Sequence, residues 1–273
     1  MIKMFVSDID GTMMQHGGTI DAADIQAMRG MAQEGIILCF ASGRLDNEIA
    51  SLMQEVGADF HRISVNGVFV YTHDDELLLH SHFDPAVLPR LLEMTNKEHL
   101  IRYISDEHSY YIEKKTPLVL QIEEQARMTS MEEPLLAEKV GTSIFPHKFT
   151  IGAETEGELL LLQREIEEAF PGKVSTFISA KLCLDIMPPD VSKGAAISVL
   201  LQQHGLEPHE MACIGDSYND IPMFGLTPHS FAMQNADEEV RTHARHVVSS
   251  VREAAAFVRQ YNRTQQQNSA GIS

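Results

Sequence analysis

The sequence predicts an α/β protein in which an α+β domain interrupts a core of parallel strands flanked by helices. Three observations support this fold class. Apolar runs typical of strands alternate with helical spacing up to Gly67, the rhythm becomes irregular from Val68 to about Cys183, and the first rhythm then resumes. With 273 residues and a hydrophobic content of 44%, the chain can form one large domain or two.

The opening segment reads strand–helix–strand–helix–strand, which is the pattern of a parallel sheet covered by helices. Its elements are a strand at Ile2–Val6, a helix capped by Asp21 and ended by Gly35, a strand at Ile36–Ala41, a helix after Ser42-Gly43-Arg44, and a strand that ends at Val65 before the turn Asn66-Gly67.

The middle segment alternates strands and helices without this regularity, which predicts an inserted α+β domain over residues 81–183. We expect antiparallel strands VFVY and LLLHSH around Asp74-Asp75, a helix near Pro85–Lys97, the hairpin LIRYISDEHSYYI, a helix near Leu118–Arg127, the strand KFTIGA and a helix at Glu156–Phe170.

The first rhythm resumes at LCLDIMP, so we assign residues 1–80 and 184–273 to the core domain. The expected elements are a helix at Gly194–His204, a buried strand MACIG, short strands SFAM and HVV, and a helix at Val251–Tyr261. The tail after about residue 262 is polar, and we expect it to be disordered.

Composition excludes several functions. The net charge of −18 and the absence of Lys/Arg runs argue against binding to nucleic acid or to an anionic membrane. The opening residues read as a strand, so we expect no signal peptide, and no apolar run reaches the length of a spanning helix. The cysteines Cys39, Cys183 and Cys213 lie in apolar runs as buried thiols would, which favours a reducing cytoplasm.

Four polar clusters follow apolar strands or open helices, and the carboxyl ends of parallel strands meet at one edge of a sheet. They are Asp8-Ile9-Asp10, Ser42-Gly43-Arg44, Ser192-Lys193 and Gly215-Asp216-Ser217-Tyr218-Asn219-Asp220. Clustered carboxylates need a cation, and oxygen-only ligands suit Mg²⁺. A hydroxyl, a lysine and backbone amides could then hold a phosphoryl group that a carboxylate attacks, forming an aspartyl-phosphate.

The motifs DIDGT, SGR, SKG and GDSYND, in this order, resemble the four motifs of haloacid-dehalogenase-like phosphatases. Asn66-Gly67 and AMQNADEEVR resemble the Cof-type subfamily, which has a Rossmann-like core and a large inserted cap. The resemblance implies Asp8 as nucleophile and Asp10 as general acid and base. It also implies phosphate binding by Ile9, Ser42, Gly43, Lys193 and Asn219, Mg²⁺ binding by Asp8, Asp10 and Asp216, and supporting roles for Asp220, Arg44 and Asn66.

The sequence thus predicts a Mg²⁺-dependent phosphatase for a small phosphorylated metabolite, either a sugar phosphate, a nucleotide or a phosphorylated cofactor. A phosphotransferase or mutase and a non-enzymatic phosphoacceptor are the alternatives. Asp10 argues against the last, because a base two residues from the nucleophile would destroy a lasting phosphoaspartate. Either a monomer or a homodimer is compatible with the sequence. We expect the 13 histidines to be structural or exposed, with His80 and His82 alternating along a strand.

Overall fold

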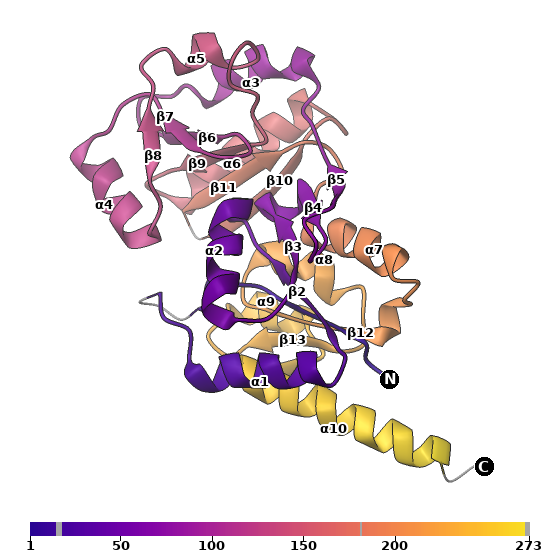
Figure 1. Ribbon diagram of the computed structural model, residues 1–273. Helices are drawn as coiled ribbons and strands as arrows, with labels where there is room; N and C mark the ends of the chain where they lie inside the picture. Colours follow the sequence, from indigo (N-terminus) through magenta and orange to yellow (C-terminus); the bar gives the residue numbers. More distant parts are fainter. Residues whose placement is uncertain (15–17, 181, 271–273) are drawn as a thin grey trace. The chain divides into compact units, whose positions relative to one another are not determined.

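The computed structural model describes residues 1–14, 18–180 and 182–270. The chain folds into two compact units, one formed by Met1–His80 and Ser192–Ser273 and the other by Ser81–Val191. Both units combine strands and helices (Figure 1), and the predicted α/β class is confirmed.

The first unit is built on an eight-stranded sheet of order β14-β13-β12-β1-β2-β3-β4-β5. The strands from β14 to β3 pair in parallel, whereas β4 and β5 are antiparallel. The strands are β1 Met4–Ser7, β2 Ile37–Ala41, β3 His61–Ser64, β4 Phe69–Tyr71, β5 Leu77–His80, β12 Met211–Gly215, β13 Ser230–Met233 and β14 His246–Val248. The helices are α1 Ala22–Gln33, α2 Asp46–Val56, α7 Lys193–Gln203, α8 Ile221–Phe224, α9 Glu238–His243 and α10 Val251–Ala270.

The central strands β1, β2 and β12 are buried on both faces, which explains their continuous apolar runs. In β1, Phe5 packs in one apolar cluster and Met4 and Val6 in the other, as the two-residue period of a strand requires. Helices α1, α2 and α10 contribute to the first cluster, and α7, α8 and α9 to the second. The carboxyl ends of the central strands are therefore held in fixed positions.

The second unit contains a six-stranded sheet of order β10-β11-β9-β6-β7-β8. Its elements are α3 Leu88–Thr95, β6 Ile101–Ser105, β7 Tyr110–Ile112, α4 Pro117–Ala126, β8 Ser130–Glu132, α5 Leu136–Lys139, β9 Lys148–Gly152, α6 Glu156–Ala169, β10 Ser175–Ala180 and β11 Cys183–Met187. An apolar cluster that includes Leu91, Phe149 and Leu162 joins helices α3 and α6 to the sheet.

Three sequence expectations need correction. The LCLDI segment does not return to the core sheet, because β11 pairs antiparallel with β9 and β10, and the second unit extends to Val191 rather than to residue 183. The tail after residue 262 is not disordered up to Ala270, since α10 continues through a stretch without Gly or Pro. His82 lies beyond β5, which ends at His80.

The expected antiparallel pairing of β4 with β5 and of β6 with β7 is confirmed. Asp21 caps α1 as predicted, and its side chain accepts a hydrogen bond from the Ala23 amide. Across the described parts of the chain, every helix is too short or too polar to cross a lipid bilayer.

Candidate active site

The four predicted polar clusters meet at the carboxyl edge of the core sheet. Asp8 directly follows β1, Ser42 follows β2 and Asp216 follows β12, while Lys193 begins α7. Hydrogen bonds connect residues of all four segments, as detailed below. The convergence expected from the sequence is therefore confirmed.

Lys193 is the central cation of this site. Only 1% of the residue is exposed, and its Nζ lies 2.6 Å from Asp8 Oδ1 and 2.6 Å from Asp220 Oδ1. Burial alone would lower the pKa of Lys193, but the two carboxylates together raise it above its usual value. The ammonium therefore stays charged and holds the two acidic segments together.

Three buried or half-buried carboxylates surround this single ammonium. Donor oxygens of Asp8, Asp216 and Asp220 lie within 4.8 Å of one another. Burial raises the pKa of Asp8 well above its usual value and raises the pKa of Asp216 to about 6. The negative charge of Asp220 raises both pKa values further. Two negative charges thus remain uncompensated when all these groups are ionised.

This arrangement fits a divalent cation. The buried Asp8 Oδ2 has no hydrogen-bond partner among the described residues, and it is therefore available as a ligand. An all-oxygen donor set with two excess negative charges matches the preference of Mg²⁺. Asp8 and Asp216 are thus the two carboxylates that suit such an ion.

Asp220 accepts three hydrogen bonds. Its Oδ2 accepts the amides of Asp216 and Ser217 at 2.8 and 2.9 Å, and its Oδ1 accepts from Lys193. A Cβ atom on Gly215 would lie 2.3 Å from Asp220 Cγ, so only glycine fits before the loop. Asp220 consequently orients Lys193 and the Asp216 loop, in line with its predicted supporting role.

Two residues of the DIDGT segment have contacts that sequence reasoning did not assign. Thr12 Oγ1 donates a hydrogen bond of 3.1 Å to Asp216 Oδ1. Gly11 has a φ of +84°, and a Cβ atom there would lie 2.2 Å from Asp216 Oδ2. The available signal was the Gly-Thr pair directly after Asp10, a short turn with a hydroxyl beside the carboxylates.

A neutral polar group completes the site. Asn219 Nδ2 donates to Asn66 Oδ1 at 3.0 Å, and the Asn66 amide donates to the Ser42 carbonyl at 2.9 Å. Asn66 adopts φ 57° and ψ 18°, a left-handed conformation that Asn tolerates better than most residues. A Cβ atom on Gly43 would lie 3.1 Å from Asn66 Oδ1. The predicted residues Ser42, Gly43, Asn66 and Asn219 therefore lie together.

Asp10 differs from the buried carboxylates. Its side chain is 54% exposed and forms a bidentate pair with Arg44, at 2.8 Å from Nε and 2.6 Å from the second guanidinium nitrogen. Arg44 thus fixes the direction of the Asp10 carboxylate. The side chain of Ile9 is fully buried, and the roles of the Ile9 amide and the Asp10 carbonyl remain predictions.

Known proteins are similar to this chain along most of its length. The profile of the haloacid dehalogenase-like hydrolase family matches residues 5–258. A protein of Escherichia coli O157:H7 named HMP-PP phosphatase is 24% identical over 254 residues, which cover 90% of this chain and 89% of that protein.

Solved structures show the same fold. A haloacid dehalogenase-like hydrolase from Bacteroides thetaiotaomicron is 25% identical, with a TM-score of 0.81 over 94% of this chain and 100% of that chain. A sugar phosphatase of subclass IIB is 18% identical, with a TM-score of 0.79 over 95% of this chain and 99% of that chain, a likeness of fold alone.

Proposed function

Because this chain belongs to the haloacid dehalogenase-like hydrolase family, we propose that it is a Mg²⁺-dependent phosphatase acting on a small phosphorylated metabolite. The observation that carries the proposal is the buried Lys193 between Asp8 and Asp220, with Asp8 Oδ2 lacking a described partner. An oxygen that is buried, unpaired and next to a fixed cation is suited to attack a phosphoryl group. The phosphatase names of the relatives support the same reaction class.

In the first step we propose, an Asp8 carboxylate oxygen attacks phosphorus. A P–O bond forms to Asp8 while the P–O bond to the alcohol breaks, and Asp10 donates a proton to the leaving oxygen. Lys193, Ser42 and the amides of Ile9 and Gly43 would stabilise the charge on the phosphoryl oxygens. Asn219, held by Asn66, would bind another of these oxygens.

In the second step, water attacks the phosphorus of the aspartyl-phosphate. Asp10 takes the proton of this water, the bond between phosphorus and Asp8 breaks, and inorganic phosphate leaves with Asp8 restored as a carboxylate. The bidentate contact of Asp10 with Arg44 supports the role of base, because the guanidinium favours the ionised carboxylate and fixes its direction while leaving it exposed to water.

Mg²⁺, held by Asp8, Asp216 and the carbonyl of Asp10, would neutralise the carboxylates and the phosphoryl oxygens. The residues of the chain then determine orientation. Thr12 and the Asp220 loop fix Asp216, and Lys193 fixes Asp8.

The three cysteines are free, which fits a reducing compartment, and we propose the cytoplasm. The substrate class is a proposal supported by the names of two similar proteins, an HMP-PP phosphatase and a sugar phosphatase.

Phosphate release from p-nitrophenyl phosphate and from a panel of metabolite phosphates tests the function. The assay compares wild type with Asp8→Asn, with Mg²⁺ and with chelator. Asp185→Asn is the matched control, because it removes a buried carboxylate in the second unit. We expect Mg²⁺-dependent turnover that only Asp8→Asn abolishes. Turnover in Asp8→Asn, or none in folded wild type with Mg²⁺, would contradict the proposal.

Two alternatives have distinct outcomes in the same assay. A phosphotransferase or mutase would give a phosphorylated sugar instead of free phosphate when an acceptor sugar is saturating. A phosphoacceptor without enzymatic activity would retain a stable phosphoryl group on Asp8, and Asp10→Asn would not lengthen the lifetime of that group.

A further inference from the structure

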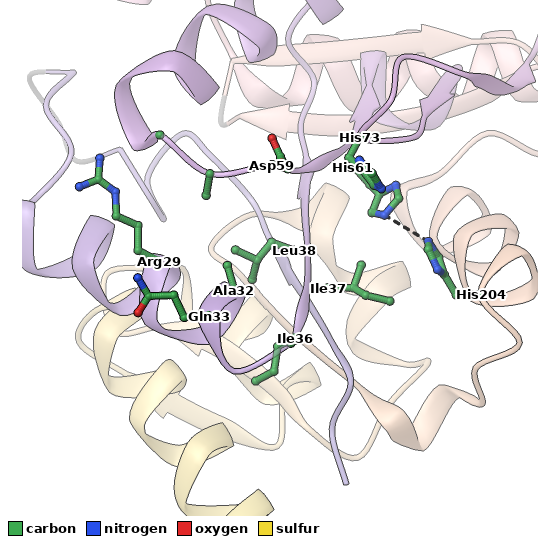
Figure 2. A pocket seen from close by; sticks show the side chains of 13 residues that line it. Arg29, Ala32, Gln33, Ile36, Ile37, Leu38, Asp59, His61, His73 and His204 are labelled. Carbon is green, nitrogen blue, oxygen red and sulfur yellow. Dashed lines mark hydrogen bonds between the residues drawn. The ribbon is translucent and has the colours of Figure 1, made fainter.

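A second cluster of ionisable side chains lies in the first unit, at the sheet edge opposite to the active site. A pocket of about 540 Å³ opens where β2 and β3 begin. His61 lies in β3, His73 follows β4, and His204 is the C-cap residue of α7. Figure 2 shows these three imidazoles grouped at one side of the pocket.

The distance between two of these rings is the key observation. Nε2 of His61 lies 3.1 Å from Nε2 of His204, and the ring centroids of His61 and His73 are 5.2 Å apart. Two nitrogens bound to one tetrahedral Zn²⁺ at 2.0–2.1 Å would lie roughly 3.3 Å apart. These two nitrogens share a hydrogen bond, so to bind one ion they must give it up, shift its proton to the other nitrogen of that ring and separate slightly.

We propose that His61 and His204 bind one late first-row transition ion, with Zn²⁺ as the best match, and that His73 is the third ligand. These ions prefer imidazole nitrogen as a ligand, whereas Mg²⁺ prefers oxygen ligands. The negative end of the α7 dipole at His204 favours a cation there. The Nδ1 of His73 lies 3.1 Å from Asp74 Oδ1, and both side chains are exposed, by 44% and 78%. To reach the pair, the His73 ring must turn away from this exposed contact, and the pocket leaves room for water as the remaining ligand.

The bound ion would link the end of α7 to β3. Its effect is stabilisation of the core unit, because an ion that binds the folded state alone raises the free energy of unfolding. This role is independent of the proposed phosphatase reaction, whose residues lie at the other end of α7.

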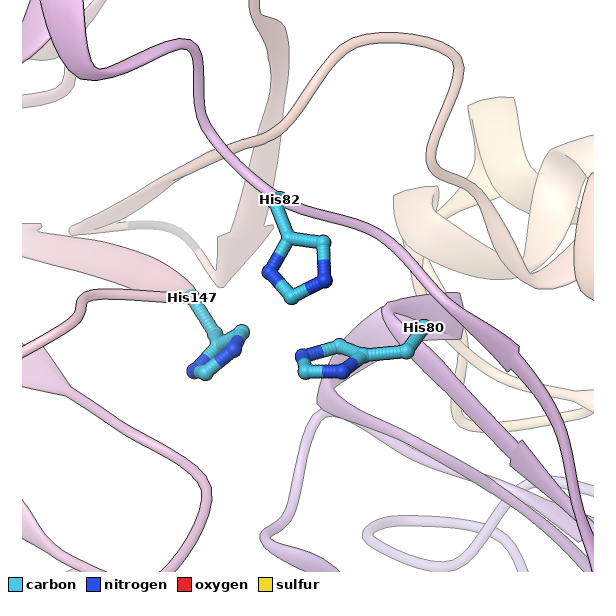
Figure 3. A group of neighbouring side chains, drawn as sticks. All are labelled: His80, His82 and His147. Carbon is cyan, nitrogen blue, oxygen red and sulfur yellow. The ribbon is translucent and has the colours of Figure 1, made fainter.

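The experiment must exclude two other sites. The carboxylates of the active site are kept saturated with millimolar Mg²⁺. In the second unit, the rings of His82 and His147, both drawn in Figure 3, could take up the same ion. Their centroids are 5.9 Å apart. All measurements therefore use a His82→Ala background, since His82 is exposed.

Zn²⁺ is titrated calorimetrically into this background and into variants that add His204→Ala or His209→Ala. His209 is exposed and close in sequence, which makes it the matched control. Loss of a residue that only hydrogen-bonds to a metal ligand weakens metal affinity about 10–100-fold, and loss of a ligand itself should cost at least as much. We therefore expect Zn²⁺ to bind at least about 10-fold more weakly to His204→Ala and with unchanged affinity to His209→Ala. Zn²⁺ should raise the melting temperature of the background and the control, but not that of His204→Ala.

Equal Zn²⁺ affinity in the background and in folded His204→Ala would overturn the site. If His204→Ala fails to fold, His204→Asn replaces it, and its Zn²⁺ affinity and melting temperature are measured in the same way. An unchanged affinity in His73→Ala would overturn the assignment of the third ligand. The absorption spectrum of bound Co²⁺ supplies an independent signature. We expect it to show nitrogen ligands in the His82→Ala background and to lose that feature in His204→Ala.

Discussion

Replacement of Lys193 by methionine tests the electrostatic reasoning most directly. The lysine is 1% exposed and compensates Asp8 and Asp220, each 2.6 Å away. Breaking a buried ion pair by removing one partner costs about 3–5 kcal/mol, since the other charge remains buried and unpaired. Two carboxylates lose their partner here, so we expect a loss of at least about 3 kcal/mol in the free energy of unfolding when chelator is present.

The loss of stability has a contribution from the unpaired charges and one from altered packing, and the two can be distinguished. Urea unfolding is measured for wild type and Lys193→Met with chelator and with Mg²⁺, at pH 7 and at pH 5. Mg²⁺ should stabilise the variant more than the wild type, because it neutralises the same carboxylates. Lowering the pH should reduce the deficit as well. An Asp whose pKa is raised in the folded state binds more protons folded than unfolded, so protonation restores stability as the pH falls.

Lys148 provides the matched control. Its ammonium is buried in the second unit and lies 3.6 Å from Asp185. Lys148→Met should also destabilise its own unit, but Mg²⁺ should not recover the loss. Equal stability of Lys193→Met and wild type in chelator would refute the reasoning. So would an equal effect of Mg²⁺ on the two methionine variants.

Three further variants test other parts of the structure. Arg44→Lys loses the bidentate contact with its carboxylate and should lower kcat about 10-fold while the stability changes by less than about 1 kcal/mol, as enzyme kinetics and urea unfolding can show. Gly11→Ala forces a Cβ atom to 2.2 Å from Asp216 and should lower turnover by about 100-fold, whereas Gly35→Ala, at a similar φ of +80° with open space around it, should leave turnover unchanged. For His61, whose pKa falls to about 4 on folding, the unfolded state binds the proton first, so wild type should lose up to about 3 kcal/mol between pH 6.5 and 4. His61→Asn should lack this part of the pH dependence when unfolding by urea is measured. An unchanged pH dependence would show that the loss of stability does not come from protonation of His61.

Much of the core could be predicted from the sequence because its local signals agree with its tertiary contacts. The strands β1, β2 and β12 are continuous apolar runs that are buried on both faces of the sheet. Polar residues directly after such strands must converge at one edge, since all these strands run in the same direction. This reasoning predicts that Asp8 and Asp216, about 200 residues apart in the sequence, lie together.

Other features depend on contacts that no local pattern specifies. The segment at Cys183–Met187 is as apolar as a core strand, and only its antiparallel pairing with β9 and β10 assigns it to the second unit. Likewise, the pairing of His61 with His204 joins a strand to the end of a distant helix. No spacing rule applies to it, and the sequence indicated only structural or exposed histidines.

The active site is most visible where a residue opposes the preference of its own element. Lys193 occupies the first turn of α7, where the helix dipole disfavours a cation by about 0.3–1 kcal/mol. Ser192 caps the N-terminus of this helix, because its side chain accepts a hydrogen bond from the Ala195 amide. The lysine therefore contributes nothing to helix formation, and its position follows from the carboxylates that it compensates. Val65, the neighbour of Asn66, has a φ of 50°, which β-branched residues rarely adopt, and so opposes its local preference in the same way. Natural proteins keep such conflicts mainly at functional sites, so the coincidence of both residues at one sheet edge is independent support for chemistry there.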